Sequence, residues 1–231
     1  MYLLILLPLV WRVRKVNYMF ENLYKINLSP QFPESHCYKQ FLFLYLSSYL
    51  SMHLDHYSVG NYSPGASFVK QVLWYFIGDW LVQAPWLPLP AFKVNLLKLF
   101  GCKIGRGVNI KPHVKIKFPW RLSLGDYVWL GEHCWIDNLA EVTIESHVCI
   151  SQNAYLCTGN HDWNKPNFDL IIAPIYIEQG CWIGANVVVG PGVRLKEGAV
   201  LTLGAVATCS LEPMTIYAGN PCMPIKKRCI Q

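Results

Sequence analysis

The sequence predicts an all-β fold, a parallel β-helix of six-residue repeats that follows an N-terminal helical segment. Three observations predict it. Branched aliphatic residues recur every six positions between residues 104 and 201, glycine directly follows several of them, and two-residue insertions fall after every third repeat. A period of six is neither the 3.6 of a helix nor the alternation of one long strand. It is typical of short strands that wind into stacked coils.

Residues 1–51 show no clear hydrophobic period, and we expect them to be a non-native or weakly ordered extension. Their first ten residues are apolar but too few to span a bilayer. The basic residues Arg12, Arg14 and Lys15 follow this run, whereas a signal peptide places such residues before it. The composition changes at Met52, which favours Met52 as the native start; a membrane-associated extension is the alternative.

Residues 52–103 are predicted to form a helical segment. Between residues 66 and 100, aromatic and aliphatic residues recur close to the helical period, and Pro85, Pro88 and Pro90 divide the pattern in two. We expect two helices that pack on the main domain. A peripheral membrane contact through the tryptophan-rich stretch is the alternative reading.

Residues 104–210 are predicted to form the β-helix. Each short strand contributes one large aliphatic side chain to the interior, a small residue fits the next corner, and three repeats close one coil. Successive coils pair their backbones at about 4.8 Å, so each coil is stabilised by its neighbours. The fourteen aliphatic anchors are Ile104, Ile110, Ile116, Leu124, Leu130, Ile136, Ile144, Ile150, Leu156, Ile177, Ile183, Val189, Leu195 and Leu201.

The six-residue repeat of aliphatic anchors is interrupted after Leu156 by a polar, proline-containing stretch. We expect residues 157–173 to project from the coils as a loop. This loop contains one histidine, His161. Imidazole, with an ordinary pKa near 6.5, can remove a hydroxyl proton near neutral pH. His161 is therefore a candidate general base, with a surface histidine as the alternative. Residues 211–231 are expected to form a C-terminal tail.

Charge and cysteine content exclude other classes. The net charge of +6 forms no long basic stripe, so we expect no nucleic-acid partner. The nine cysteines form no CxxC pair, so no structural zinc site and no other metal is expected. Cysteines within apolar stretches behave as small hydrophobes and indicate a reducing compartment. We expect a cytoplasmic protein, with a peripheral position at the inner membrane face as a further possibility.

Several stretches together cover residues 58–229 with a recognisable pattern. They are WYFIGDWLVQAPWLP, FKVNLLKLFGCKIGRGVNIKP, WIDNLAEVTI, CISQNAYLCTGNHDW, CWIGANVVVGPGV and YAGNPCMPIKKR. The chain resembles the hexapeptide-repeat acyltransferases, above all the sugar and exopolysaccharide O-acetyltransferases, including those of colanic-acid biosynthesis. The resemblance implies a left-handed β-helix, a homotrimer with active sites in the grooves between subunits, and acetyl-CoA as the donor.

The resemblance also assigns roles to residues. In the family motif, the base is the histidine of a T-x-x-H segment, which Thr158 to His161 match. Family matching suggests backbone contacts to acetyl-CoA near Ala185 and Thr208, and contact of Lys226 with its phosphates. A solvated charge cluster is the alternative for Lys226. Met223 departs from the family, in which a basic residue is common at this position.

Four polar or aromatic residues are candidates for binding the acceptor. Asp137 and Asn138 interrupt the aliphatic series one coil before the loop, so they are expected to bind sugar hydroxyls or else to form a turn. Asp162 could orient the imidazole or remain a solvated or capping residue. Trp163 could form a wall of the acceptor pocket or pack in the core.

The sequence therefore predicts an O-acetyltransferase that moves an acetyl group from acetyl-CoA to a hydroxyl of a sugar or exopolysaccharide precursor, with a lipid-linked saccharide as a possible acceptor. One alternative is a γ-type carbonic anhydrase-like zinc enzyme, for which His113, His133 and His147 are the candidates. The five-residue histidine spacing of that class is absent from the repeats. A non-catalytic β-helix binding subunit is the other alternative.

The assignment of the native start is tested by intact mass. Protein isolated from its natural host is expected to have the mass of a chain that begins at Met52. A mass that corresponds to all 231 residues would contradict this assignment.

Overall fold

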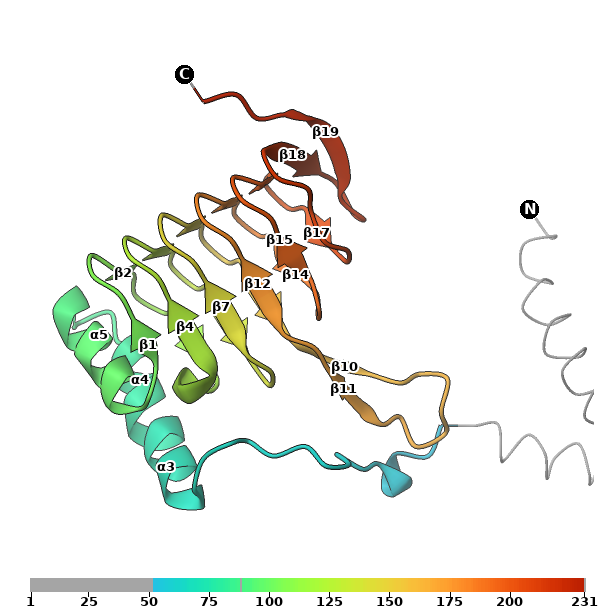
Figure 1. Cartoon of the computed structure of the whole chain (residues 1–231). Helices are drawn as coiled ribbons and strands as arrows, with labels where there is room; N and C mark the ends of the chain where they lie inside the picture. The colour runs from blue at the N-terminus through green and yellow to red at the C-terminus, as the bar shows by residue number, and fades with distance from the viewer. Residues whose placement is uncertain (1–51, 88, 231) are drawn as a thin grey trace, which may run out of the picture. The chain divides into compact units, whose positions relative to one another are not determined.

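The structure is a computed structural model that describes residues 52–87 and 89–230. The expectations for residues 1–51, including the start at Met52, concern a segment that lies outside the described residues. The described chain forms a ladder of stacked coils, with helices at the first coil and two longer strands at the last (Figure 1). The predicted β-helix with an N-terminal helical region is confirmed.

The helical region consists of two segments, as the prolines predict. The first is continuous through α3 (Phe68–Leu73), the π-helical turn η2 (Trp74–Gly78) and α4 (Asp79–Gln83), and the second is α5 (Pro90–Leu99). A short 3-10 helix, η1 (Leu54–His56), precedes them.

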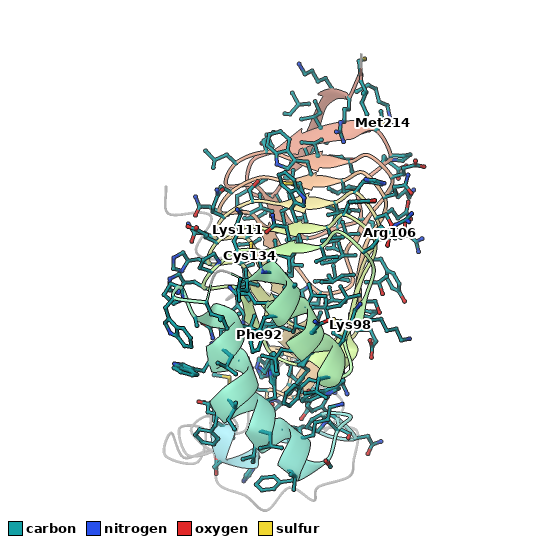
Figure 2. The ribbon with its side chains drawn as sticks, turned by 90° about the vertical axis from the view of Figure 1, so that its left-hand side faces the viewer. Phe92, Lys98, Arg106, Lys111, Cys134 and Met214 are labelled. Carbon is teal, nitrogen blue, oxygen red and sulfur yellow. The ribbon has the colours of Figure 1, made fainter. Side chains whose placement is uncertain are left out.

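Trp74 attaches the first helical segment to the solenoid. Its side chain is buried, and its indole N–H donates a hydrogen bond of 3.0 Å to the carbonyl of Ile116. Helix α5 lies across the end of the ladder, where Figure 2 shows Phe92 and Lys98 on its surface. Together these helices cover the first coil.

The coils build three sheets, which we call the first, second and third sheets in chain order. The first contains β1 (Lys103–Ile104), β4 (Leu122–Leu124), β7 (Val142–Ile144), β12 (Ile175–Ile177) and β15 (Arg194–Leu195). The second contains β2 (Asn109–Ile110), β5 (Trp129–Leu130), β8 (Cys149–Ile150), β13 (Trp182–Ile183), β16 (Val200–Leu201), β18 (Thr215–Ala218) and β19 (Met223–Lys227). The third contains β3 (Lys115–Ile116), β6 (Trp135–Asp137), β9 (Tyr155–Cys157), β14 (Val188–Val189) and β17 (Val206–Ala207).

The core consists of aliphatic ladders that run through the stacked coils. The parallel register places Leu130 beside Ile110 on one side and beside Ile150 on the other. All the predicted anchors are buried except Ile104 of the first coil, which is half-buried. Cys134 and Cys181 fill corners of the same core, and burial raises the pKa of each thiol to about 11. These thiols therefore act as small apolar groups.

The stack continues beyond residue 210, where the sequence predicts the solenoid to end. Leu211 forms a parallel bridge with Leu195, and β18 pairs in parallel with β16. Strand β19 then folds back antiparallel to β18. Much of the expected tail therefore closes the last coil.

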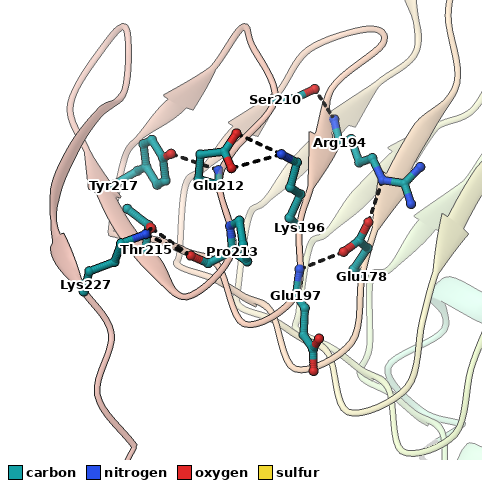
Figure 3. A network of polar contacts seen from close by, with 10 residues as sticks. All are labelled: Glu178, Arg194, Lys196, Glu197, Ser210, Glu212, Pro213, Thr215, Tyr217 and Lys227. Atoms are coloured by element: carbon teal, nitrogen blue, oxygen red, sulfur yellow. Dashed lines mark hydrogen bonds and ion pairs between the residues drawn. The ribbon is translucent and has the colours of Figure 1, made fainter.

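Surface ion pairs and hydrogen bonds link these last coils (Figure 3). Two of them join neighbouring turns of the solenoid, and the third joins β18 to β19. The pairs are Glu178 with Arg194 at 2.6 Å, Glu212 with Lys196 at 2.9 Å, and Thr215 with Lys227 at 2.9 Å. Such exposed contacts contribute little stability individually, so the buried ladders dominate.

Among the described residues, no helix combines the length and the apolar character that a membrane span requires.

Glycine after an anchor is needed where the next coil approaches closely. A Cβ atom at Gly184 would lie 2.8 Å from the carbonyl oxygen of Leu201, whereas one at Gly190 would lie 3.2 Å from that of Ala207. We expect Gly184→Ala to lower the free energy of unfolding by about 1–3 kcal/mol, because backbone atoms cannot move aside easily. Gly190→Ala is the matched control, with a smaller loss. Urea unfolding of both variants measures this, and equal losses would contradict it.

Candidate active site

The series of six-residue repeats is interrupted by a hairpin that projects from the coils between β9 and β12 (Figure 1). Its strands are β10 (Gly159–His161) and β11 (Leu170–Ile172), which pair antiparallel and place His161 opposite Leu170. The sequence predicts a loop over residues 157–173, and the structure gives it this regular form.

Thr158 fixes the base of the hairpin. Its side chain is fully buried; the hydroxyl donates to the carbonyl of Asp137 at 2.9 Å and accepts from the N–H of Ala140 at 3.0 Å. The threonine of the T-x-x-H segment therefore attaches the hairpin to the coil below, and the histidine follows on the projecting strand.

A hydrogen bond fixes the tautomer of His161. Its Nδ1 lies 3.0 Å from the carbonyl oxygen of Phe168. Because a carbonyl oxygen only accepts hydrogen bonds, Nδ1 carries the proton in the neutral ring and Nε2 keeps its lone pair. Phe168 has a φ of 53°, a left-handed conformation that is uncommon for a bulky residue. The hairpin turn thus presents an imidazole with a free basic nitrogen.

Two aromatic rings hold this imidazole in place. The Phe168 ring stacks on it at a centroid distance of 4.3 Å and an angle of 6°, and the Tyr57 ring lies 5.7 Å away. The N–H of His53 donates to the carbonyl of Pro166 at 2.8 Å, which keeps the Tyr57 segment beside the hairpin. Sequence reasoning missed Phe168 and Tyr57, because no spacing or motif marks either residue.

The two residues after His161 differ in their surroundings: Asp162 makes contacts within the hairpin turn, whereas Trp163 is exposed to solvent. The Asp162 carboxylate accepts a hydrogen bond of 3.2 Å from the N–H of Asn164 and lies 3.6 Å from the Lys165 ammonium. These contacts cap the hairpin turn, and within the described chain Asp162 makes no contact with the imidazole. Trp163 is 70% exposed, so its ring is available to a ligand or a partner.

Asp137 belongs to a polar cluster on the outer face of the third sheet. One carboxylate oxygen lies 2.9 Å from the Lys117 ammonium, and the other accepts a 3.2 Å hydrogen bond from the Tyr155 hydroxyl. Burial, followed by Cys157 and Asp137, raises the pKa of Tyr155, so this hydroxyl keeps its proton. The cluster presents a carboxylate and an ammonium side by side, a combination that can bind hydroxyl groups.

Asn138 has a structural role, which corrects its assignment to the acceptor. Its side chain is fully buried. Its amide oxygen accepts from the Phe118 N–H at 2.9 Å, and its amide nitrogen donates to the Phe118 carbonyl at 2.7 Å. Consecutive residues of a strand alternate between faces, so Asn138 turns inward where Asp137 faces outward.

The residues assigned to the donor lie on the later coils and the last strand. The N–H groups of Ala185 and Thr208 make no hydrogen bond to the described part of the chain. Lys226 pairs with Ile216 through the backbone of β19, and its side chain is exposed and has no hydrogen bond or ion pair with the described residues. Its neighbours differ: Lys227 donates to Thr215, and Arg228 donates to the carbonyls of two glycines. Lys226 is therefore the lysine of this tail that is available to an anion.

The histidines considered for zinc form pairs. The rings of His113 and His133 stack at 4.5 Å, and His147 stacks on Tyr127 at 5.3 Å. Within residues 52–87 and 89–230, no group of three or more His, Cys, Asp or Glu side chains could hold a metal ion.

The chain belongs to the hexapeptide-repeat acetyltransferases. It is 40% identical over 180 residues to the putative colanic acid biosynthesis acetyltransferase WcaF of Escherichia coli, covering 76% of this chain and 96% of the relative. The E. coli galactoside O-acetyltransferase is 26% identical over 136 residues, 58% of this chain and 67% of that protein.

Solved structures show the same fold. A hexapeptide-repeat acetyltransferase from Vibrio cholerae in complex with acetyl-CoA matches with a TM-score of 0.64 and 22% identity, covering 71% of this chain and 91% of that one. A galactoside acetyltransferase in complex with coenzyme A matches with a TM-score of 0.61 and 22% identity, covering 69% and 80%. No family model matches the sequence.

The structural role of Asn138 is tested by two neighbouring substitutions. Asn138→Ala removes both hydrogen bonds to Phe118 and leaves its backbone groups unsatisfied, so we expect it to lower the free energy of unfolding by about 2–4 kcal/mol. Asp137→Asn keeps an acceptor for Tyr155, and we expect a loss below about 1 kcal/mol. Urea unfolding compares the two. An Asn138→Ala variant that remains stable would return this residue to the acceptor site.

Proposed function

We propose that the chain is an O-acetyltransferase that moves an acetyl group from acetyl-CoA to a hydroxyl of a saccharide, such as a colanic-acid-like exopolysaccharide precursor. The observation that carries this proposal is the state of His161, whose Nδ1–H is held by the Phe168 carbonyl while Nε2 is free. The names of the relatives, which include colanic acid biosynthesis and galactoside O-acetylation, support the acceptor class. The neighbours bound to acetyl-CoA and coenzyme A support the donor.

In the proposed reaction, His161 is the general base. Its Nε2 takes the proton of the acceptor hydroxyl as that oxygen attacks the thioester carbonyl carbon. Backbone N–H groups would stabilise the resulting oxyanion. The intermediate then collapses: the carbon–sulfur bond breaks, the acetyl ester remains on the acceptor, and the thiolate takes the proton back from the imidazolium.

The proposed donor site uses groups that the fold leaves available. The N–H groups of Ala185 and Thr208 would donate to carbonyls of the acetyl-CoA chain, and the Lys226 ammonium would contact its phosphates. The proposed acceptor site uses Asp137 on the third sheet, with Trp163 as an exposed aromatic platform. Asp162 would contribute by shaping the hairpin that carries the base, because its carboxylate caps the turn.

We further propose a homotrimer. The His161 hairpin projects away from its own coils, so a neighbouring subunit would provide the opposite wall of the active site. This arrangement agrees with the position of Trp163, which is exposed in the single chain. We expect the enzyme to act in the cytoplasm, where acetyl-CoA is available, with peripheral contact to the inner membrane face.

The role of His161 is tested by acetyl-CoA turnover. We expect His161→Ala to lower acceptor-dependent thiol release by about 10²–10⁴-fold, the usual size of a general-base effect. His133→Ala is the matched control, because this histidine is exposed at a corner of the coils, away from the hairpin; we expect it to retain activity. The measurement uses a panel of saccharide acceptors and a thiol-reactive dye. Unchanged release by His161→Ala would contradict the assignment of the base.

A further inference from the structure

A groove of about 510 Å³ lies between the first helical segment and the outer face of the third sheet. One wall is formed by α3, η2 and the start of α4, and the other by β3, the residues after it, and β6. Its lining includes Phe68, Val72, Tyr75, Phe76, Lys117 and Trp135.

The helical wall of the groove is apolar and exposed. Phe68, Val72 and Tyr75 follow one another at helical spacing, so they line one side of the segment. Phe68 is 79% exposed and Phe76 is 70% exposed, although both are large apolar residues. Trp74, which also lines the groove, is buried and already attaches this segment to the coils. The exposed aromatic face is therefore not needed for packing and indicates a binding surface.

The opposite wall connects the groove to the proposed acceptor site. Trp135 lines the groove, and Asp137 lies two residues further on the same face of β6. Lys117 belongs to both places, because it lines the groove and pairs with Asp137 at 2.9 Å. The sheet wall of the groove thus carries Lys117 next to the acceptor cluster, whereas the helical wall is mainly aromatic.

Asp79 places an unsatisfied polar group in the groove. Its Oδ2 accepts a hydrogen bond of 2.7 Å from Gln83, and its Oδ1 is buried without a hydrogen-bond partner among the described residues. Burial raises the pKa of this carboxyl group. A buried carboxylate oxygen without a partner is costly, which favours the protonated form of this side chain.

We propose that this groove binds the apolar aglycone of the acceptor, with the saccharide at Lys117 and Asp137, so that the preferred substrate class is an amphipathic glycoside or lipid-linked saccharide rather than a free sugar. The inference rests on the proposed O-acetyltransferase function. The occupant is one molecule with a polar and an apolar part, because the groove combines exposed aromatic residues on its helical wall with Lys117 and its partner Asp137 beside the sheet wall. A bilayer surface would instead meet convex side chains such as Trp80 and Trp86, which do not line the groove.

The test compares octyl β-galactoside with methyl β-galactoside, both as monomers, in the full chain. Each methylene that moves from water into the groove improves binding by about fourfold. We therefore expect kcat/KM for the octyl glycoside to be at least about tenfold higher, through KM. Calorimetry without acetyl-CoA measures binding of both glycosides separately from catalysis.

Phe76→Ser is the test variant, because this ring lines the groove but is exposed and not part of the core. We expect it to reduce the octyl-to-methyl ratio of kcat/KM, and the calorimetric affinity for the octyl glycoside, by about fivefold or more. Phe92→Ser is the matched control, a second exposed phenylalanine that lies on α5 outside the groove; we expect it to leave both values unchanged.

The outcomes separate this inference from the proposed function. Acetyl transfer with equal preference for both glycosides, unaffected by Phe76→Ser, would leave the transferase in place and overturn the groove assignment. Tight octyl binding that Phe76→Ser abolishes, without transfer to either glycoside, would support the groove and count against galactoside acetylation.

Two further readouts test other occupants of the groove. If Phe76→Ser dissociates the oligomer in size-exclusion chromatography, the groove is a subunit interface and the inference is overturned. If Phe76→Ser reduces sedimentation with anionic phospholipid vesicles but leaves octyl glycoside binding intact, the face is a membrane contact and the inference is likewise overturned.

Discussion

The stacking of one coil on the next is the constraint on which the rest of the structure depends. Each short strand forms its backbone hydrogen bonds with the strand one coil above and one coil below, so an isolated coil would leave its polar groups unsatisfied. Stacking also fixes the register, because every anchor must lie above an anchor. A residue inserted within a strand would move all later side chains out of the ladder. Variation is consequently restricted to the corners.

One corner carries nearly all of this variation, and the hairpin with the proposed base His161 projects from it. The connections from the third sheet to the first contain the 3-10 turn Pro119–Arg121, the short link at residues 138–141 and the His161 hairpin. Because these insertions occupy the same corner of consecutive coils, they lie near one another although they are about 20 residues apart in sequence. The rigid coils thus present a set of irregular segments at one edge, which suits a binding site.

The repeat, which the structure confirms, and His161, which remains the proposed base, stand out in the sequence for different reasons. The anchors are visible because burial repeats every six residues, and His161 is visible because it lies where that repetition stops. Phe168 and Tyr57 were not predictable, since their contacts with His161 depend on the path of the hairpin turn and of the preceding segment. Asn138 was misassigned because a polar residue at a strand end has the same appearance in sequence whether it faces inward or outward.

Under the proposed function, the solenoid allows one hairpin with the base His161 to be combined with different acceptor sites. On the outer face of the third sheet, Lys115, Trp135 and Tyr155 occupy one stacked column, and Lys117, Asp137 and Cys157 occupy another. These side chains point away from the core, so each can be exchanged without disturbing an aliphatic ladder. The base, in contrast, depends on a backbone carbonyl for its tautomer and on buried Thr158 for the attachment of its hairpin. Acceptor preference can therefore change on the sheet face while the proton-transfer geometry is kept.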